Sequence, residues 1–176
     1  MAISENMRAQ QKGFQQAMKN ANDGVAVLQT AESGYQSVSD LLVRMRELAV
    51  QSANDSVSDT ERNYLETEFD DLIEEIDRVS AVVEYNGIQL LDGTAGSGGD
   101  GTMTFQVGTR NSTNDRIEID LNTQSSAKLD VEAADTTIAT QSGSQSAISK
   151  IDLALESLST DRATLGSTIN ELNHAV

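Results

Sequence analysis

The chain has 176 residues, a formal net charge of −16 and no cysteine, proline or tryptophan. The negative charge excludes a nucleic-acid binder, which needs a basic surface to meet phosphates, and it also excludes docking on an anionic membrane surface. The missing cysteines exclude disulfides, thiolate metal sites and cysteine nucleophiles. With only three Phe and three Tyr, any core must be built mainly from aliphatic side chains, as in elongated helical bundles.

Residues 1–54 have the spacing of one long helix. Every seventh position is apolar or small: Met7, Phe14, Ala21, Leu28, Tyr35, Leu42 and Ala49. A second series lies beside it on the same helical face: Ala17, Ala31, Val38 and Met45. Because this seam is narrow and continuous, it predicts a helix of roughly 75 Å, at ~1.5 Å per residue, packed along its length against a partner.

A second helix is predicted over residues 58–86. It begins with a capping box, in which the Ser58 hydroxyl and the Glu61 carboxylate each accept a hydrogen bond from the other residue's backbone N–H. Its apolar stripe follows 4-3-4-3-4 spacing: Leu65, Phe69, Leu72, Ile76, Val79 and Val83. Asn86 and Gly87 are expected to end it, because glycine supplies the positive φ that helix ends favour.

A β-hairpin region is predicted over residues 88–130. Apolar and polar residues alternate in two runs, around Phe105 and around Ile119, which are joined by a polar tip. A two-stranded hairpin is marginal alone, so its apolar face should pack on the helices.

Residues 129–143 are irregular in pattern, and the last helix is predicted over residues 144–176. The predicted fold is mainly α with a small β-hairpin region: an elongated antiparallel bundle of two N-terminal helices and one C-terminal helix, with the hairpin packed at one end. Because the apolar periodicity is already under way where the chain starts and still under way where it stops, we expect the first and last helices to continue beyond the sequence.

Several ordered motifs in this chain resemble bacterial flagellin. The amino-terminal ones are residues 2–10, residues 20–24 and the run Arg-Glu-Leu-Ala-Val-Gln-Ser-Ala-Asn at 46–54. Glu-Glu-Ile-Asp-Arg-Val-Ser at 74–80 and Tyr-Asn-Gly at 85–87 continue the likeness, as do Leu90-Leu91, Ile151-Asp152 and Leu165-Gly166. The resemblance implies the inner rod domain of flagellin, without the terminal coiled-coil segments. The stretch from 127 to 144 is too short to hold the outer domains that larger members insert.

The resemblance also implies a role and partners. Flagellin is exported unfolded and polymerises outside the cell into the filament that drives motility, so we expect a secreted, extracellular flagellar subunit. The expected partners are other flagellin subunits, an export chaperone and the cap protein. The chain itself is expected to be monomeric, because the segments that drive polymerisation in the family lie outside it.

The rod domain of the family is also the surface recognised by Toll-like receptor 5. By likeness, the recognised arginine, leucine and glutamate fall on Arg44, Leu48 and Glu68, and we expect the same patch to contribute to protofilament packing. Arg44 and Leu48 are four residues apart and so share a helical face, and arginine is often an interface hot spot. The alternative is that Arg44 forms a salt bridge within the bundle and Leu48 packs in it. A glutamine precedes the arginine in many receptor-activating members, whereas Val43 stands here.

No set of residues in the sequence predicts an enzyme, a metal site or a cofactor. The acidic pairs at 70–71 and 74–75 flank the apolar stripe and are interpreted as a solvated face. Asp100 lies in a glycine-rich loop that lacks the other spaced carboxylates of a calcium site. His174, the only histidine, has no partner for a triad or a zinc site.

Two other functions stay open from the sequence. One is a hook–filament junction protein, which shares flagellin-like ends. The other is an acidic helical binding module or adhesin whose rod presents a ligand surface.

Overall fold

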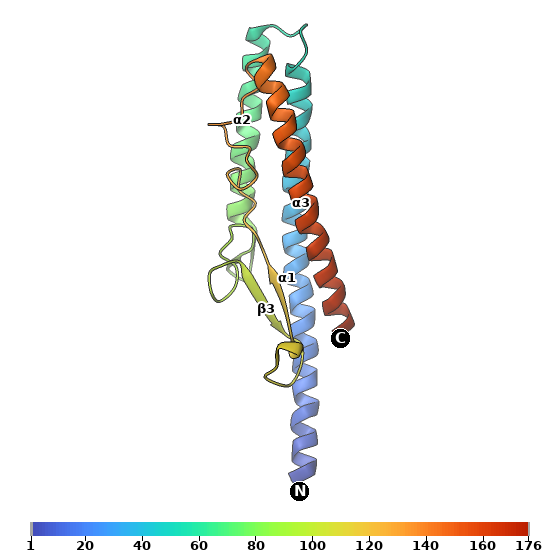
Figure 1. Ribbon diagram of the computed structural model, residues 1–176. Helices are drawn as coiled ribbons and strands as arrows, with labels where there is room; N and C mark the ends of the chain where they lie inside the picture. The colour runs from blue at the N-terminus through green and yellow to red at the C-terminus, as the bar shows by residue number, and fades with distance from the viewer. Residues whose placement is uncertain (1, 176) are drawn as a thin grey trace.

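The computed structural model describes residues 2–175 and forms a long, thin rod (Figure 1). Its helices are α1 (Ala2–Ser52), α2 (Asp59–Val82) and α3 (Gln141–Ala175), and α2 and α3 both run antiparallel to α1. Met1 and Val176, which the predicted helices include, lie outside the described residues. The predicted class, a mainly α antiparallel bundle with a small β-hairpin region, is confirmed.

The predicted seam of α1 forms the core of the rod. Its members from Ala17 onwards are almost completely buried: Ala17, Ala21, Leu28, Ala31, Tyr35, Val38, Leu42, Met45 and Ala49. The first two members of the heptad series differ, since Met7 is 67% exposed and Phe14 is 57% exposed. Within the described residues α3 does not reach this end of α1 (Figure 1), so the seam there has no partner.

The start of α2 was predicted correctly and its end was not. Ser58 is the N-cap, and the capping box with Glu61 is complete. The helix stops at Val82, however, because the chain turns back at once into a short antiparallel pair, β1 (Glu84–Tyr85) with β2 (Ile88–Gln89). Asn86 and Gly87 have positive φ values of 52° and 78°, which is the geometry of a two-residue hairpin turn and not of a helix cap.

The predicted hairpin is present as β3 (Thr102–Gln106) paired with β4 (Arg116–Asp120), with Met103 opposite Ile119. The short 3-10 helix η1 (Thr113–Asp115) lies in its tip. Three glycines of α1, which have no side chain, leave space for other segments to pack closely against this helix. A Cβ atom on Gly13 would lie 2.9 Å from a Thr109 atom of the hairpin tip, and one on Gly24 would lie 2.9 Å from a Phe105 atom. The third, Gly34, faces Leu91 and Val83.

The segment between β4 and α3 has no regular structure, as predicted, but it is tied to α2 by carboxylates. Asp77 accepts hydrogen bonds from the backbone N–H and the hydroxyl of Ser126, at 2.7 and 2.8 Å. Glu66 accepts from Thr137 and from the backbone N–H of Ile138. The helix α3 begins at Gln141, three residues earlier than predicted, because the Thr140 hydroxyl caps it by accepting from the Gly143 N–H. No helix among the described residues is long and apolar enough to cross a membrane.

We predict that the rod loses stability at alkaline pH because of the buried side chain of Tyr35. Burial raises the pKa of Tyr35 well above its ordinary value, and the nearby carboxylate of Asp161 raises it further. An acid whose pKa is raised by folding ionises first in the unfolded chain. Its contribution to stability is therefore complete below pH about 10, the ordinary tyrosine pKa, and is lost as the pH rises above it.

Urea unfolding on both sides of this pH tests the effect. We expect the free energy of unfolding to fall between about pH 9 and about pH 11, and to fall less in the variant Tyr35→Phe, which has no phenol to ionise. An equal loss in both proteins would show that Tyr35 does not cause it.

Candidate functional site

Arg44 lies on α1 at the centre of an ion-pair cluster that bridges to α2. Its Nε and Nη2 donate to Glu68 Oε1 at 2.9 and 2.6 Å, and its Nη1 donates to Glu47 Oε2 at 3.0 Å. The side chains of Arg44 and Glu68 stay 49% and 46% exposed. The hydrogen bond with Glu68, and then the one with Glu47, raise the pKa of Arg44. The cluster is therefore a fixed, charged and accessible feature of the rod surface.

Leu48 is placed differently from the other two predicted contact residues. It is only 1% exposed, so it packs inside the bundle while Arg44 and Glu68 pair at its surface. Four residues on a helix correspond to a rotation of about 40° beyond one full turn, and that rotation carries Leu48 from the surface beside Arg44 into the core. This arrangement matches the alternative given in the sequence analysis, in which Arg44 forms a salt bridge within the bundle and Leu48 packs in its core.

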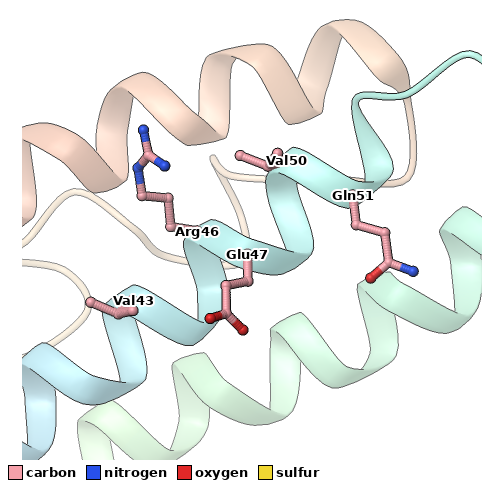
Figure 2. Close-up of a pocket in the computed structure, with 5 residues that line it drawn as sticks. All are labelled: Val43, Arg46, Glu47, Val50 and Gln51. Atoms are coloured by element: carbon pink, nitrogen blue, oxygen red, sulfur yellow. The ribbon is translucent and has the colours of Figure 1, made fainter.

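The neighbouring surface of α1 forms an open groove of about 370 Å³. Figure 2 shows its lining, which comes entirely from α1: Val43, Arg46, Glu47, Val50 and Gln51. Val43 and Val50 are 46% and 48% exposed, and Arg46 crosses to α3, where its Nε donates to Asp152 Oδ1 at 2.7 Å. This groove was not predicted from the sequence. The signal was available, because Val43 and Val50 are apolar residues one heptad apart and outside the buried seam.

The carboxylate pairs of α2 do not converge on a site. Asp71 and Glu74 are exposed, and Glu75 accepts two hydrogen bonds from Arg78. Burial, followed by the neighbouring charges of Glu66, Asp71 and Glu74, raises the pKa of Asp70. Within residues 2–175, no cluster of His, Asp and Glu side chains has the geometry to hold a metal ion.

The comparisons with known proteins decide the family. A family model described as the bacterial flagellin N-terminal helical region matches residues 1–96, more than half of the chain. The chain belongs to the bacterial flagellin family. Its long α1, its capped α2 and the Arg44 cluster all lie inside the matched flagellin region.

Individual flagellins are similar along the whole chain. The flagellin of Halalkalibacterium halodurans is 39% identical and aligns with 100% of this chain, which spans 62% of that relative. The flagellar filament 30.7 kDa core protein of Treponema maltophilum is 36% identical, covering 99% of this chain and 64% of its own length. The crystal structure of Bacillus cereus flagellin superposes with a TM-score of 0.76 at 26% identity, over 90% of this chain and 86% of that one. This chain thus spans less than two thirds of the length of the curated relatives.

Proposed function

We propose that this chain is part of a structural subunit of the bacterial flagellar filament, exported from the cell and assembled outside it, with no enzymatic role. Membership of the flagellin family carries the proposal. A rod with a charged, accessible side and an apolar groove is also suited to lateral contacts between subunits. We also propose that residues 1–176 belong to a single rod domain, with no outer domain between β4 and α3.

The composition of isolated filaments tests this function. Filaments sheared from the source cells should contain this chain as a principal protein by mass spectrometry. Filaments that lack it would contradict the proposal. So would a chain that appears only in the short basal segment left on the cell after shearing, because that location fits a junction protein.

We also propose that other flagellin subunits contact the Arg44–Glu68 cluster, and that Toll-like receptor 5 binds there when the subunit is free. The export chaperone and the cap protein are proposed partners through the family alone. Arg44 is well suited to such a contact, since its guanidinium is held in place by two carboxylates and is still half exposed. Leu48 is buried and would act indirectly, by supporting the backbone beneath Arg44.

The variant Arg44→Ala is expected to assemble into filaments less well and to bind the receptor more weakly, with no significant change in melting temperature. The reason is that it removes an exposed charge and no core contact. Arg78→Ala is the matched control, because it breaks another surface Arg–Glu pair, which lies within α2. Leu48→Ala is unsuitable as a contact test, since emptying a buried leucine site costs about 2–5 kcal/mol of stability. Unchanged assembly and receptor binding in Arg44→Ala would refute the proposed contact.

A further inference from the structure

Asn86 and Gly87 form the turn between β1 and β2, and they are the only Asn-Gly pair in the chain. Both residues are exposed. Apart from the two chain neighbours of Gly87, nothing lies within 4 Å of the position that a Cβ atom on it would occupy. Among the described residues, the Gly87 N–H donates to no backbone carbonyl. The backbone amide of Gly87 is therefore open to solvent and directly follows an exposed asparagine side chain.

An asparagine followed by glycine can modify itself with water as the only other reactant. The backbone nitrogen of Gly87 loses its proton and attacks Cγ of Asn86. A C–N bond forms, the Cγ–Nδ2 bond breaks and ammonia leaves, which closes a five-membered imide ring. Glycine favours this step because it has no Cβ atom to hinder the ring. Water then opens the ring at one of its two carbonyl carbons, giving either aspartate or isoaspartate, in which the main chain runs through Cγ.

The folded turn holds the reacting atoms apart. Ring closure requires the Gly87 nitrogen to lie next to Cβ of Asn86 in a view along the Cα–C bond. A two-residue hairpin turn with positive φ at both positions, 52° and 78° here, is of type I′, and ψ at its first position is about +30°. This ψ turns the Gly87 nitrogen towards the backbone nitrogen of Asn86 and away from its Cβ. The attack therefore requires the β1–β2 hairpin to open.

We propose that Asn86 is a site of spontaneous deamidation that is controlled by the fold. It reacts readily in the unfolded chain and, in the folded rod, only when the β1–β2 hairpin opens. The hairpin pairs only two residues of each strand, so it opens at a lower free energy than the whole rod. Because deamidation is irreversible, the modified fraction records how long the turn has been open. The inference does not depend on the proposed filament function.

Modification at this exposed turn is expected to affect the core. Isoaspartate adds one carbon to the main chain of a two-residue turn, so β1 and β2 cannot keep their register. Leu90 and Leu91 follow β2 directly and are completely buried, and the Leu90 N–H donates to the Val83 carbonyl at 3.0 Å. The new carboxylate would also line the groove that Asp23 lines, which places two negative charges there. We therefore expect the isoaspartate form to be less stable.

Mass spectrometry tests the site and its control by the fold. The purified chain is incubated at mildly alkaline pH, either folded or unfolded in guanidinium chloride, and then digested. Trypsin releases residues 79–110 as one peptide, in which Asn86 is the only asparagine. In the unfolded chain Asn86 should deamidate faster than every other asparagine. Folding should slow it at least about tenfold, the factor expected for a hairpin that is open less than about a tenth of the time.

Two results of this experiment would overturn the inference. Equal rates in the folded and unfolded chains would show that the fold does not control the reaction. An asparagine elsewhere that reacts faster than Asn86 in the unfolded chain would show that the site is wrong.

A variant with a loosened hairpin tests the opening route. Gln89→Ala removes the 2.8 Å hydrogen bond from the Gln89 side chain to the Ala81 carbonyl of α2, and it leaves the Asn-Gly pair unchanged. Asn86 should deamidate about 2- to 10-fold faster in the folded variant than in the folded wild type, the range that corresponds to one lost hydrogen bond. The rates in the unfolded chains should be equal. Gln36→Ala is the matched control, since it removes a side-chain bond within α1, and an unchanged rate in folded Gln89→Ala would contradict the opening route.

The variant Asn86→Asp separates the effect of the new charge from that of the longer main chain. It carries the carboxylate of the deamidated chain without the extra main-chain carbon. The deamidated fraction of an aged sample can be isolated by its additional negative charge. It should melt at a lower temperature than Asn86→Asp, because part of it contains isoaspartate. Equal melting temperatures would contradict the expected effect on the core.

Discussion

Replacing Phe69 with alanine is expected to destabilise the rod by about 3–5 kcal/mol, the usual cost of removing a buried aromatic side chain. Phe69 is completely buried and is one of the largest side chains in the core. The chain has only three Phe and no Trp, so few side chains of similar size can fill the space that it leaves. A domain is typically stable by only about 5–15 kcal/mol, and this variant should therefore lose a large part of its stability.

Tyr64→Ala is the matched control for this experiment. It removes a second aromatic ring from α2, but Tyr64 is 73% exposed, so the change should stay within about 0.5 kcal/mol. Urea unfolding followed by circular dichroism measures both variants against the wild type. Similar losses in the two variants would contradict the burial of Phe69 in the core.

Gly34→Ala is expected to destabilise the protein although alanine is the better helix former. The added methyl group would lie 2.5 Å from Leu91 Cδ1 and 3.1 Å from Val83 Cγ2, and Leu91 is completely buried. Overpacking of this kind costs about 1–3 kcal/mol, which exceeds or cancels the gain of about 1 kcal/mol from helix propensity. Gly34 thus leaves the space beside α1 that the segment following α2 occupies.

Gly166→Ala provides the opposite expectation with the same chemical change. Gly166 lies inside α3, and apart from the adjoining residues and backbone of its own helix nothing stands within 4 Å of the position that its Cβ would occupy. The substitution should therefore stabilise the protein by about 0.5–1 kcal/mol. The two melting temperatures should move in opposite directions, and stabilisation by both substitutions would argue against the close approach of Leu91 to α1.

The sequence was sufficient to predict elements in which local signals and packing agree. The heptad series from Ala21 to Ala49, the capping box at Ser58 and the alternation around Phe105 each had one consistent interpretation. The end of α2 was predicted wrongly because Asn86-Gly87 is compatible with both a helix cap and a hairpin turn. Pairing of Glu84–Tyr85 with Ile88–Gln89 selects the turn, and that pairing cannot be derived from periodicity.

The candidate site was only partly predictable. The family resemblance pointed to Arg44, Leu48 and Glu68, and the structure brings Arg44 and Glu68 together in one ion pair. The four-residue spacing supported Leu48 by placing it on the same helical face as Arg44, but that spacing does not define which part of a helical face is covered by a neighbour. The exposed groove at Val43 and Val50 depends on where α2 and α3 leave α1 uncovered, and the positions of those helices come from the tertiary fold.

Immunogold electron microscopy of the source cells, with antibodies raised against this chain, tests the central claim most directly. Gold particles along the entire length of the flagellar filament are the predicted result. Label confined to the junction of hook and filament would make the chain a junction protein. Label elsewhere on the cell surface, with unlabelled filaments, would contradict the filament function and favour an adhesin.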